Sequence, residues 1–115
     1  MKLAIVGSRN FTNYIVLETF ILANYQLKDI SEIISGGAIG TDTLAELFAK
    51  PNNIPTVIYL PEWSKYGKSA GYIRNKLIVE AADDIIAFWD GKSPGTKLSI
   101  DLAKQYNKSL KICYF

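Results

Sequence analysis

The sequence predicts an α/β fold: a three-layer sandwich whose middle layer is a mostly parallel, five-stranded sheet. Two observations lead to this fold class. Short apolar runs alternate with longer, helix-like stretches along the whole chain. Several of the short runs are continuously apolar, as at residues 85–89, a pattern typical of parallel strands that helices cover on both faces.

The expected elements alternate from one end of the chain to the other. Strands are expected at 3–6, 32–35, 56–60, 84–89 and 110–115, and helices at 14–26, 41–50, 70–82 and 95–107. Within the later helices, apolar residues recur at the spacing of one helical face: Leu44, Leu47 and Phe48, then Ile73, Leu77, Ile78 and Ala81, then Leu98, Leu102 and Tyr106. A polar and aromatic insert at 61–71 separates the third strand from its helix.

The helix expected at 14–26 is apolar almost all round. Its apolar residues are Ile15, Val16, Leu17, Phe20, Ile21, Leu22 and Ala23. A surface helix needs only one apolar stripe. This helix therefore either packs deeply or forms a contact between copies of the chain, which makes a homo-oligomer one expected assembly.

Length and composition limit the class of protein. The 115 residues suit one domain spanning 1–115, and 49% hydrophobic with 21% charged residues is ordinary globular composition. No apolar run approaches a membrane span, and the apolar start after Lys2 is too short for a secretory signal. Since Cys113 is the one cysteine, no internal disulfide forms. A cytoplasmic location without a membrane partner is expected.

The residue types that are missing exclude several chemistries. The chain has no histidine, which excludes Ser-His-Asp and Cys-His catalysis and His-ligated metals. A single cysteine also excludes thiolate zinc sites, and no metal is expected. The net charge of +2 is too small to indicate binding to DNA by itself. On this ground nucleic acid is not the expected partner.

Three small or polar loops follow expected strands, at 7–10, 35–42 and 90–96. Ligands of open α/β sheets bind at the carboxyl ends of the strands. Glycine permits close approach of a ligand to the backbone, and a helix that starts directly afterwards favours an anion through its free N–H groups and its dipole. Thr41 and Thr96 stand where an N-cap or a phosphate-binding hydroxyl is expected. These loops predict a site for a small-molecule nucleotide or nucleotide-derived ligand, with no cofactor assigned.

Side chains in and near these loops suit the parts of a nucleotide. The guanidinium fork of Arg9 matches phosphate oxygens, and the carboxylates of Asp42 and Asp90 suit ribose hydroxyls. Tyr66 could stack on a base. Trp63 and Trp89 are instead expected to pack in apolar cores. The candidate ligand-binding residues are Gly7, Ser8, Arg9, Ser35, Gly36, Gly37, Gly40, Thr41, Asp42, Tyr66, Lys68, Arg74, Asn75, Asp90, Gly91, Ser93, Gly95 and Thr96.

Two common nucleotide motifs are absent. The P-loop pattern would need glycine at Glu62 or Ile86, and the dinucleotide fingerprint would need glycine at Ser35. The chain therefore has no P-loop and is not expected to be a standard NAD dehydrogenase.

Taken in order, the motifs resemble the SLOG superfamily, in particular its YspA-like, cpYpsA-related branch. The resemblance rests on Gly7-Ser8-Arg9 with Phe11, SGGAIGTD at 35–42 with Ala45, Pro61, Trp63, Tyr66-Gly67-Lys68, Ala70-Gly71, Arg74-Asn75, Ala82-Asp83, AFWDG at 87–91 and Gly95-Thr96. It implies a Rossmann-like fold with a nucleotide-ligand pocket at these loops.

The resemblance leaves three functions open. The first is a sensing or sequestering domain for a nucleotide-type ligand. The second is an N-glycosidic hydrolase like the LOG enzymes, with Arg74, Asp42 and Asp90 as working residues; Ser99 stands where LOG enzymes have a glutamate, which favours binding over catalysis. The third is single-stranded nucleic-acid binding, as in Smf/DprA, which would need a basic groove with exposed aromatic residues.

Overall fold

Five parallel strands form one sheet in the computed structural model, which describes all 115 residues. The strands are β1 (Lys2–Gly7), β2 (Glu32–Ser35), β3 (Thr56–Ile58), β4 (Asp84–Trp89) and β5 (Ser109–Tyr114). Their order is β3-β2-β1-β4-β5, and every pairing is parallel. The strand order reverses between β1 and β4, which is where an open sheet of this kind leaves a crevice at its carboxyl edge.

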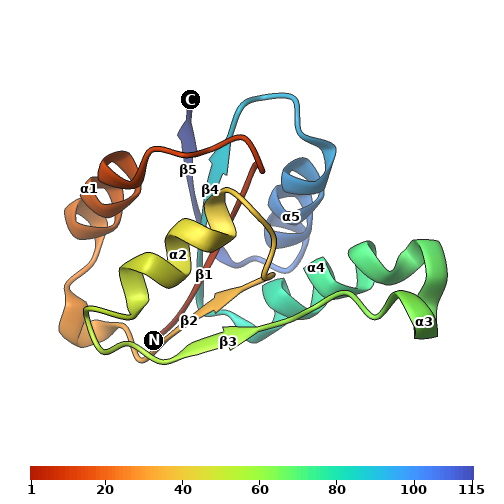
Figure 1. Cartoon of the computed structure of the whole chain (residues 1–115), viewed down its shortest axis with the longest axis horizontal. Helices are drawn as coiled ribbons and strands as arrows, with labels where there is room; N and C mark the ends of the chain where they lie inside the picture. The colour runs from red at the N-terminus through yellow and green to blue at the C-terminus, as the bar shows by residue number, and fades with distance from the viewer.

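Four helices cover the two faces of the sheet (Figure 1). Helices α1 (Tyr14–Asn24) and α2 (Thr41–Ala49) pack on one face, and α4 (Ala70–Ala81) and α5 (Pro94–Gln105) pack on the other. A short helix, α3 (Trp63–Tyr66), and the 3-10 turn Gly67–Ser69 precede α4 and project away from the sheet. The expected Rossmann-like α/β fold is confirmed.

Each face of the sheet has its own apolar core, and β4 contributes to both. Ile86 and Phe88 belong to the cluster beneath α1 and α2, whereas Ile85 and Ala87 belong to the cluster beneath α4 and α5. Successive side chains of a strand point to opposite faces. This alternation explains why the run at 85–89 is continuously apolar.

Two residues expected to face the sheet do not. Leu47 is 55% exposed and Leu77 is 44% exposed, whereas Phe48 and Ile78 are buried. Helix α2 turns positions 44, 45, 48 and 49 to the sheet, and α4 turns Ile78 and Val79 inward. Apolar spacing gives the period of a helix but not the rotation that tertiary packing selects, so these two assignments were wrong.

Helix α1 does not pack deeply on all sides. Leu17 and Ile21 are buried, but Ile15 is 73% exposed and Leu22 is 49% exposed. The helix also ends at Asn24 instead of 26, because Tyr25 is extended. The outer face of α1 therefore stays apolar and uncovered in the isolated chain, and an interface between copies remains a prediction.

Other boundaries shift by one or two residues. The fourth major helix begins at Pro94, one residue before the expected start, because proline is well accommodated in the first helical turn. Strand β3 ends at Ile58, and the following residues lead to α3. No helix of the chain is both long enough and apolar enough to cross a membrane.

Substitutions at two neighbouring residues of α2 test how this helix is rotated on the sheet. Replacing Phe48, which is fully buried, by alanine should lower the free energy of unfolding by about 3–5 kcal/mol, since it removes a large core side chain. Leu47→Ala is the matched control, and it should change stability by less than about 0.5 kcal/mol because Leu47 is exposed. Urea unfolding of both variants measures the difference. Equal losses would contradict the rotation of α2.

Candidate functional site

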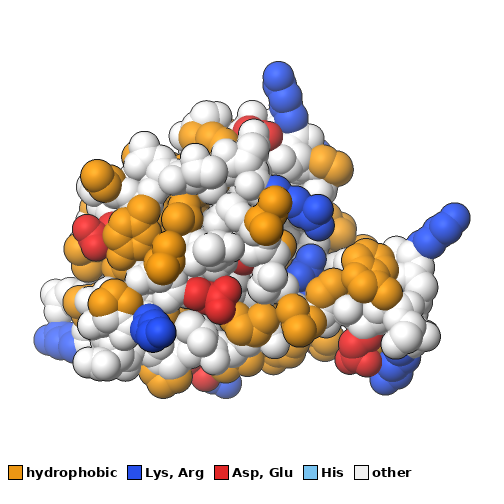
Figure 2. Space-filling model, viewed as in Figure 1, with side chains coloured by type: hydrophobic (Ala, Val, Ile, Leu, Met, Phe, Trp, Pro, Cys, Tyr) orange, Lys and Arg blue, Asp and Glu red, His pale blue; other side chains and the backbone are white.

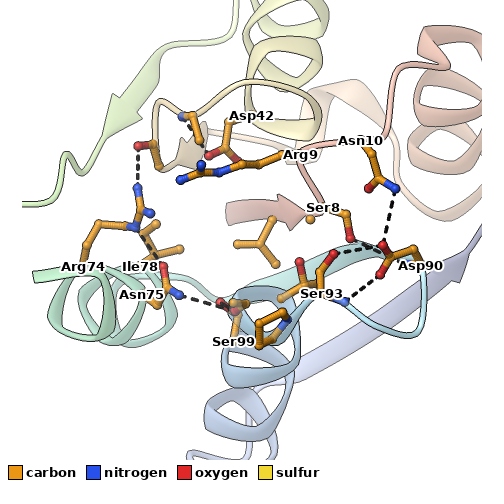
Figure 3. A pocket seen from close by; sticks show the side chains of 17 residues that line it. Ser8, Arg9, Asn10, Asp42, Arg74, Asn75, Ile78, Asp90, Ser93 and Ser99 are labelled. Carbon is orange, nitrogen blue, oxygen red and sulfur yellow. Dashed lines mark hydrogen bonds between the residues drawn. The ribbon is translucent and has the colours of Figure 1, made fainter. Parts of the chain in front are cut away.

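A pocket of about 480 Å³ opens at the carboxyl edge of the sheet, beside the ends of the paired strands β1 and β4. Figure 3 shows side chains from several loops and from the first turns of α4 and α5 pointing into it. Its seventeen lining residues are Val6, Gly7, Ser8, Arg9, Asn10, Gly36, Ala38, Asp42, Arg74, Asn75, Ile78, Asp90, Ser93, Pro94, Gly95, Thr96 and Ser99. The volume lies within the range of small-molecule sites.

The loop after β1 is held through the backbone of Ser8. The Ser8 carbonyl accepts hydrogen bonds from the Thr41 hydroxyl at 2.9 Å and from the Thr41 and Phe11 amides at 3.4 and 3.3 Å. The Ser8 amide donates to the Phe88 carbonyl at 2.9 Å. Thr41 is therefore neither the N-cap, which is Gly40, nor a phosphate-binding hydroxyl, because its side chain is buried and already bonded.

Two glycines let the first and second loops touch. A β-carbon at Gly7 would lie 2.5 Å from Thr41 Oγ1 and 2.6 Å from the Phe88 carbonyl oxygen. Gly40 has φ +76°, and a β-carbon there would collide with the backbone of Arg9. Only glycine meets both demands. The contact places Arg9 at the mouth of the pocket.

Two arginines share this pocket (Figure 3). Arg74 is held in place: Nη1 donates to the Gly36 carbonyl at 2.7 Å, and Nε donates to Asn75 Oδ1 at 2.8 Å. Arg9 makes no hydrogen bond or ion pair. Burial lowers the pKa of Arg74, Asp42 raises it, and the charge of Arg9 lowers it again. The pocket therefore contains two cations, Arg9 and Arg74, and two carboxylates, Asp42 and Asp90, and the Arg9 side chain is the one of these four without a partner.

Asp42 organises the loop after β2. Its Oδ2 accepts the Ala38 amide at 3.0 Å, and its side chain is buried beneath that loop. Burial raises the pKa of the Asp42 carboxyl, whereas the Ala38 N–H and the charge of Arg74 oppose the rise. A β-carbon at Gly36 would meet both Arg74 Nη1 and Asp42 Oδ2, at 2.6 and 3.0 Å. Glycine at 36 therefore leaves room for both side chains.

The Asp90 carboxylate accepts hydrogen bonds from its own loop. It accepts the Lys92 and Ser93 amides at 2.9 and 2.8 Å, the Ser93 hydroxyl at 3.0 Å and Asn10 Nδ2 at 3.4 Å. The Ser93 and Lys92 amides lower its pKa to about 2. The Asp90 carboxylate thus uses the hydrogen-bond donors of Lys92 and Ser93, which are not left for a ligand. The donors left for a ligand are the first N–H groups of α5, which have no intrahelical partner.

Eleven of the eighteen candidate residues line the pocket, and seven do not. The seven are Ser35, Gly37, Gly40, Thr41, Tyr66, Lys68 and Gly91. Four of them shape or support the loops: Ser35 is buried with no hydrogen-bond partner for Oγ, and Gly37, Gly40 and Gly91 have positive φ. Tyr66 and Lys68 lie on the projecting segment around α3, outside the pocket.

Six lining residues were not among the candidates: Val6, Asn10, Ala38, Ile78, Pro94 and Ser99. Asn10 follows Arg9 in a loop at the carboxyl end of a strand, and this position could have identified it as a pocket residue. Ser99 lies one turn after Thr96 on α5, and its hydroxyl donates to the Gly95 carbonyl at 3.4 Å. Thr96 lines the pocket, but as a residue of the first turn and not as the N-cap, which is Ser93.

Of the two tryptophans, Trp89 packs against an apolar core as expected, whereas Trp63 does not. Trp63 is 58% exposed, so its expected packing in a satellite core was wrong. Helix α3 projects from the body of the molecule, and no apolar cluster covers the Trp63 side chain. Trp89 is half-buried, and its Nε1 donates to the Ser93 carbonyl at 3.1 Å. Trp89 therefore braces the loop that ends the pocket. No three metal-ligating side chains gather anywhere in the chain.

The low pKa of Asp90 gives a testable pH dependence. Since its folded pKa of about 2 lies below the ordinary 3.8, it contributes stability that is present above about pH 4 and is lost as the pH falls toward 2. Asp90→Asn should therefore be less stable than the wild type at neutral pH, with a difference that shrinks between about pH 4 and 2. Thermal unfolding across this range measures it. Asp101→Asn, which loses only an exposed ion pair, is the control, and an Asp90→Asn deficit that does not vary with pH would contradict the assignment.

Known proteins similar to this chain fall into two groups. Gene 61 protein of Mycobacterium phage D29 is 34% identical over 71 residues, which is 56% of this chain and 57% of that protein. Among solved structures, DNA processing protein A (DprA) from Helicobacter pylori superimposes with a TM-score of 0.74 at 27% identity, over 97% of this chain and 64% of that one. DprA from Streptococcus pneumoniae gives 0.78 at 22% identity, over 96% and 49%. The chain spans less than two thirds of each.

The expectation that nucleic acid is not a partner is overturned by these neighbours. Both are DprA proteins, and the Helicobacter pylori protein binds single-stranded DNA. The net charge of +2 averages over the whole surface and does not show that Arg9 and Arg74 line one pocket, together with Asp42 and Asp90.

The resemblance drawn from the motifs is confirmed by a family model. The model covers residues 1–66, more than half of the chain, including the loops after β1 and β2. The chain belongs to the YspA, cpYpsA-related SLOG family.

Proposed function

We propose that this chain binds single-stranded DNA and holds one backbone phosphate in the pocket between Arg9 and Arg74. The observation that carries the proposal is the unpaired guanidinium of Arg9, which shares the pocket with the anchored Arg74. The structural likeness to a DprA that binds single-stranded DNA supports it.

The donors around the pocket suit a phosphate group. Arg9 has its whole fork available, and Arg74 uses Nε and Nη1 but keeps Nη2 free. Guanidinium forks match phosphate oxygens in pairs. The amides of Gly95 and Thr96, in the first turn of α5, add backbone donors and the positive end of a helix dipole. Together these groups supply donors from two sides of the pocket.

The size of the pocket favours a single strand over a duplex. About 480 Å³ accommodates one nucleotide unit, and a flexible strand can turn one phosphate inward while its bases stay outside. The small net charge of the chain fits binding through few phosphates. Few phosphate contacts mean a shallow dependence of affinity on salt concentration.

The second candidate function is binding of a free nucleotide, in a sensing or sequestering role. It is favoured by Asp42 and Asp90, whose carboxylates line the same pocket. A carboxylate oxygen with spare lone pairs can accept a ribose hydroxyl. The same two carboxylates and Arg74 would serve an N-glycosidic hydrolase. Mass spectrometry of the nucleotide after incubation with the protein therefore shows whether it is bound intact or cleaved.

Removal of the free arginine tests the main proposal. Arg9→Ala should weaken binding of a short fluorescein-labelled oligothymidylate by about tenfold or more, because hydrogen bonds to charged groups are lost. It should also reduce the slope of log K against log salt by about 0.7, the value for one phosphate contact on a single strand. Fluorescence anisotropy at several salt concentrations measures both quantities.

The control is Lys28→Ala, which removes a positive charge from the turn before β2, at the opposite edge of the sheet. This variant should bind like the wild type. If both variants lose affinity equally, binding is nonspecific and the pocket assignment is wrong. If the wild type binds a mononucleotide and no oligonucleotide, the second candidate replaces the first, and thermal stabilisation by the mononucleotide gives its affinity.

A further inference from the structure

A strip of exposed apolar side chains runs beside the pocket. It consists of Ile39, Leu60, Trp63 and Tyr66, which are 69%, 64%, 58% and 36% exposed. We call these four residues the rim strip. They lie in the loop before α2, after β3 and on α3, and Figure 2 shows hydrophobic side chains along this part of the surface. Contiguous exposed apolar surface marks a binding face more often than scattered residues do.

The rim strip lies outside the pocket but borders two of the elements that line it, the loop before α2 and helix α4. The loop that carries Ile39 also supplies Gly36 and Ala38 to the pocket wall, and it touches Leu60, since a β-carbon at Gly37 would lie 2.7 Å from Leu60 Cδ2. At the other end, Trp63 lies beside Gly71, one turn before Arg74 on α4. A ligand that leaves the pocket on this side meets the strip.

The charges beside the rim strip favour an anionic occupant. Lys65 and Lys68 flank Tyr66, and neither forms an ion pair. Lys65 Nζ lies 5.0 Å from the centre of the Tyr66 ring. Glu62 is the acidic residue on this segment, so the two lysines leave a net positive charge around the aromatic rings.

We propose that the rim strip stacks the bases of the nucleotides adjoining the phosphate held by Arg9 and Arg74. This inference rests on the proposed function and extends it to the bases. Aromatic side chains next to a basic groove accept any base, since every base has a π-face. Trp63 has the largest aromatic surface of the strip, Tyr66 adds a second ring, and Ile39 and Leu60 provide an apolar floor.

The test compares Trp63→Ala with Trp63→Phe on two probes. One probe is an oligothymidylate, and the other is an abasic oligonucleotide of the same length and charge. Trp63→Ala should bind the oligothymidylate about 5- to 150-fold more weakly, the effect of one lost base–aromatic contact, and should bind the abasic probe like the wild type. Trp63→Phe, which keeps an aromatic ring, should retain most of the affinity.

Each other outcome has a distinct meaning. Equal affinity of Trp63→Ala and the wild type for the oligothymidylate would overturn the rim strip alone. Equal losses on both probes would show that the substitution disturbs phosphate binding, which would also overturn it. If the wild type binds neither probe, the proposed function fails and this inference fails with it. If light scattering finds a dimer that Trp63→Ala dissociates without changing oligonucleotide affinity, the strip is a contact between copies.

Discussion

The site depends on close contact between the backbones of two loops. Gly7 lies against Thr41 and the Phe88 carbonyl, Gly40 lies against the backbone of Arg9, and the Ser8 carbonyl accepts both the amide and the hydroxyl of Thr41. A β-carbon at either glycine would push the loops apart. This contact joins the end of β1 to the start of α2 and sets Arg9 at the mouth of the pocket. The packing of the two loops therefore also determines where the charge of Arg9 lies.

The remaining polar groups divide between those that hold the loops and those left for a ligand. Asp42 is committed to the Ala38 amide, Asp90 to the turn before α5, and Arg74 in part to the Gly36 carbonyl. Arg9 and the first amides of α5 have no partner in the chain. Because the carboxylates accept hydrogen bonds from the chain and the Arg9 guanidinium donates none, this division supports the proposal of an anionic ligand. The exposed aromatic residues of α3 are the ones on which we propose that the adjoining bases stack.

The elements could be predicted because apolar runs and glycine-rich turns are local signals. The edge at which the pocket lies could be predicted because parallel strands share one carboxyl edge. Prediction from the sequence failed where the answer depends on contacts distant in sequence. Thr41 turns its hydroxyl to Ser8, 33 residues away, and no local pattern shows this. Leu47 and Trp63 are exposed because of how α2 is rotated and where α3 projects. Net charge carries no information on where the arginines lie, so the sequence could not show that Arg9 and Arg74 line one pocket.

The central claim, that a nucleotide phosphate enters the pocket between Arg9 and Arg74, is tested most directly by titrating the isotopically labelled protein with a short oligothymidylate and following backbone amide shifts by NMR. The account predicts that the largest shifts fall on residues 8–10, 36–38 and 95–96, the loops and helix turn that line the pocket. Largest shifts on the outer face of α1 or on β5, with the pocket amides unmoved, would contradict it.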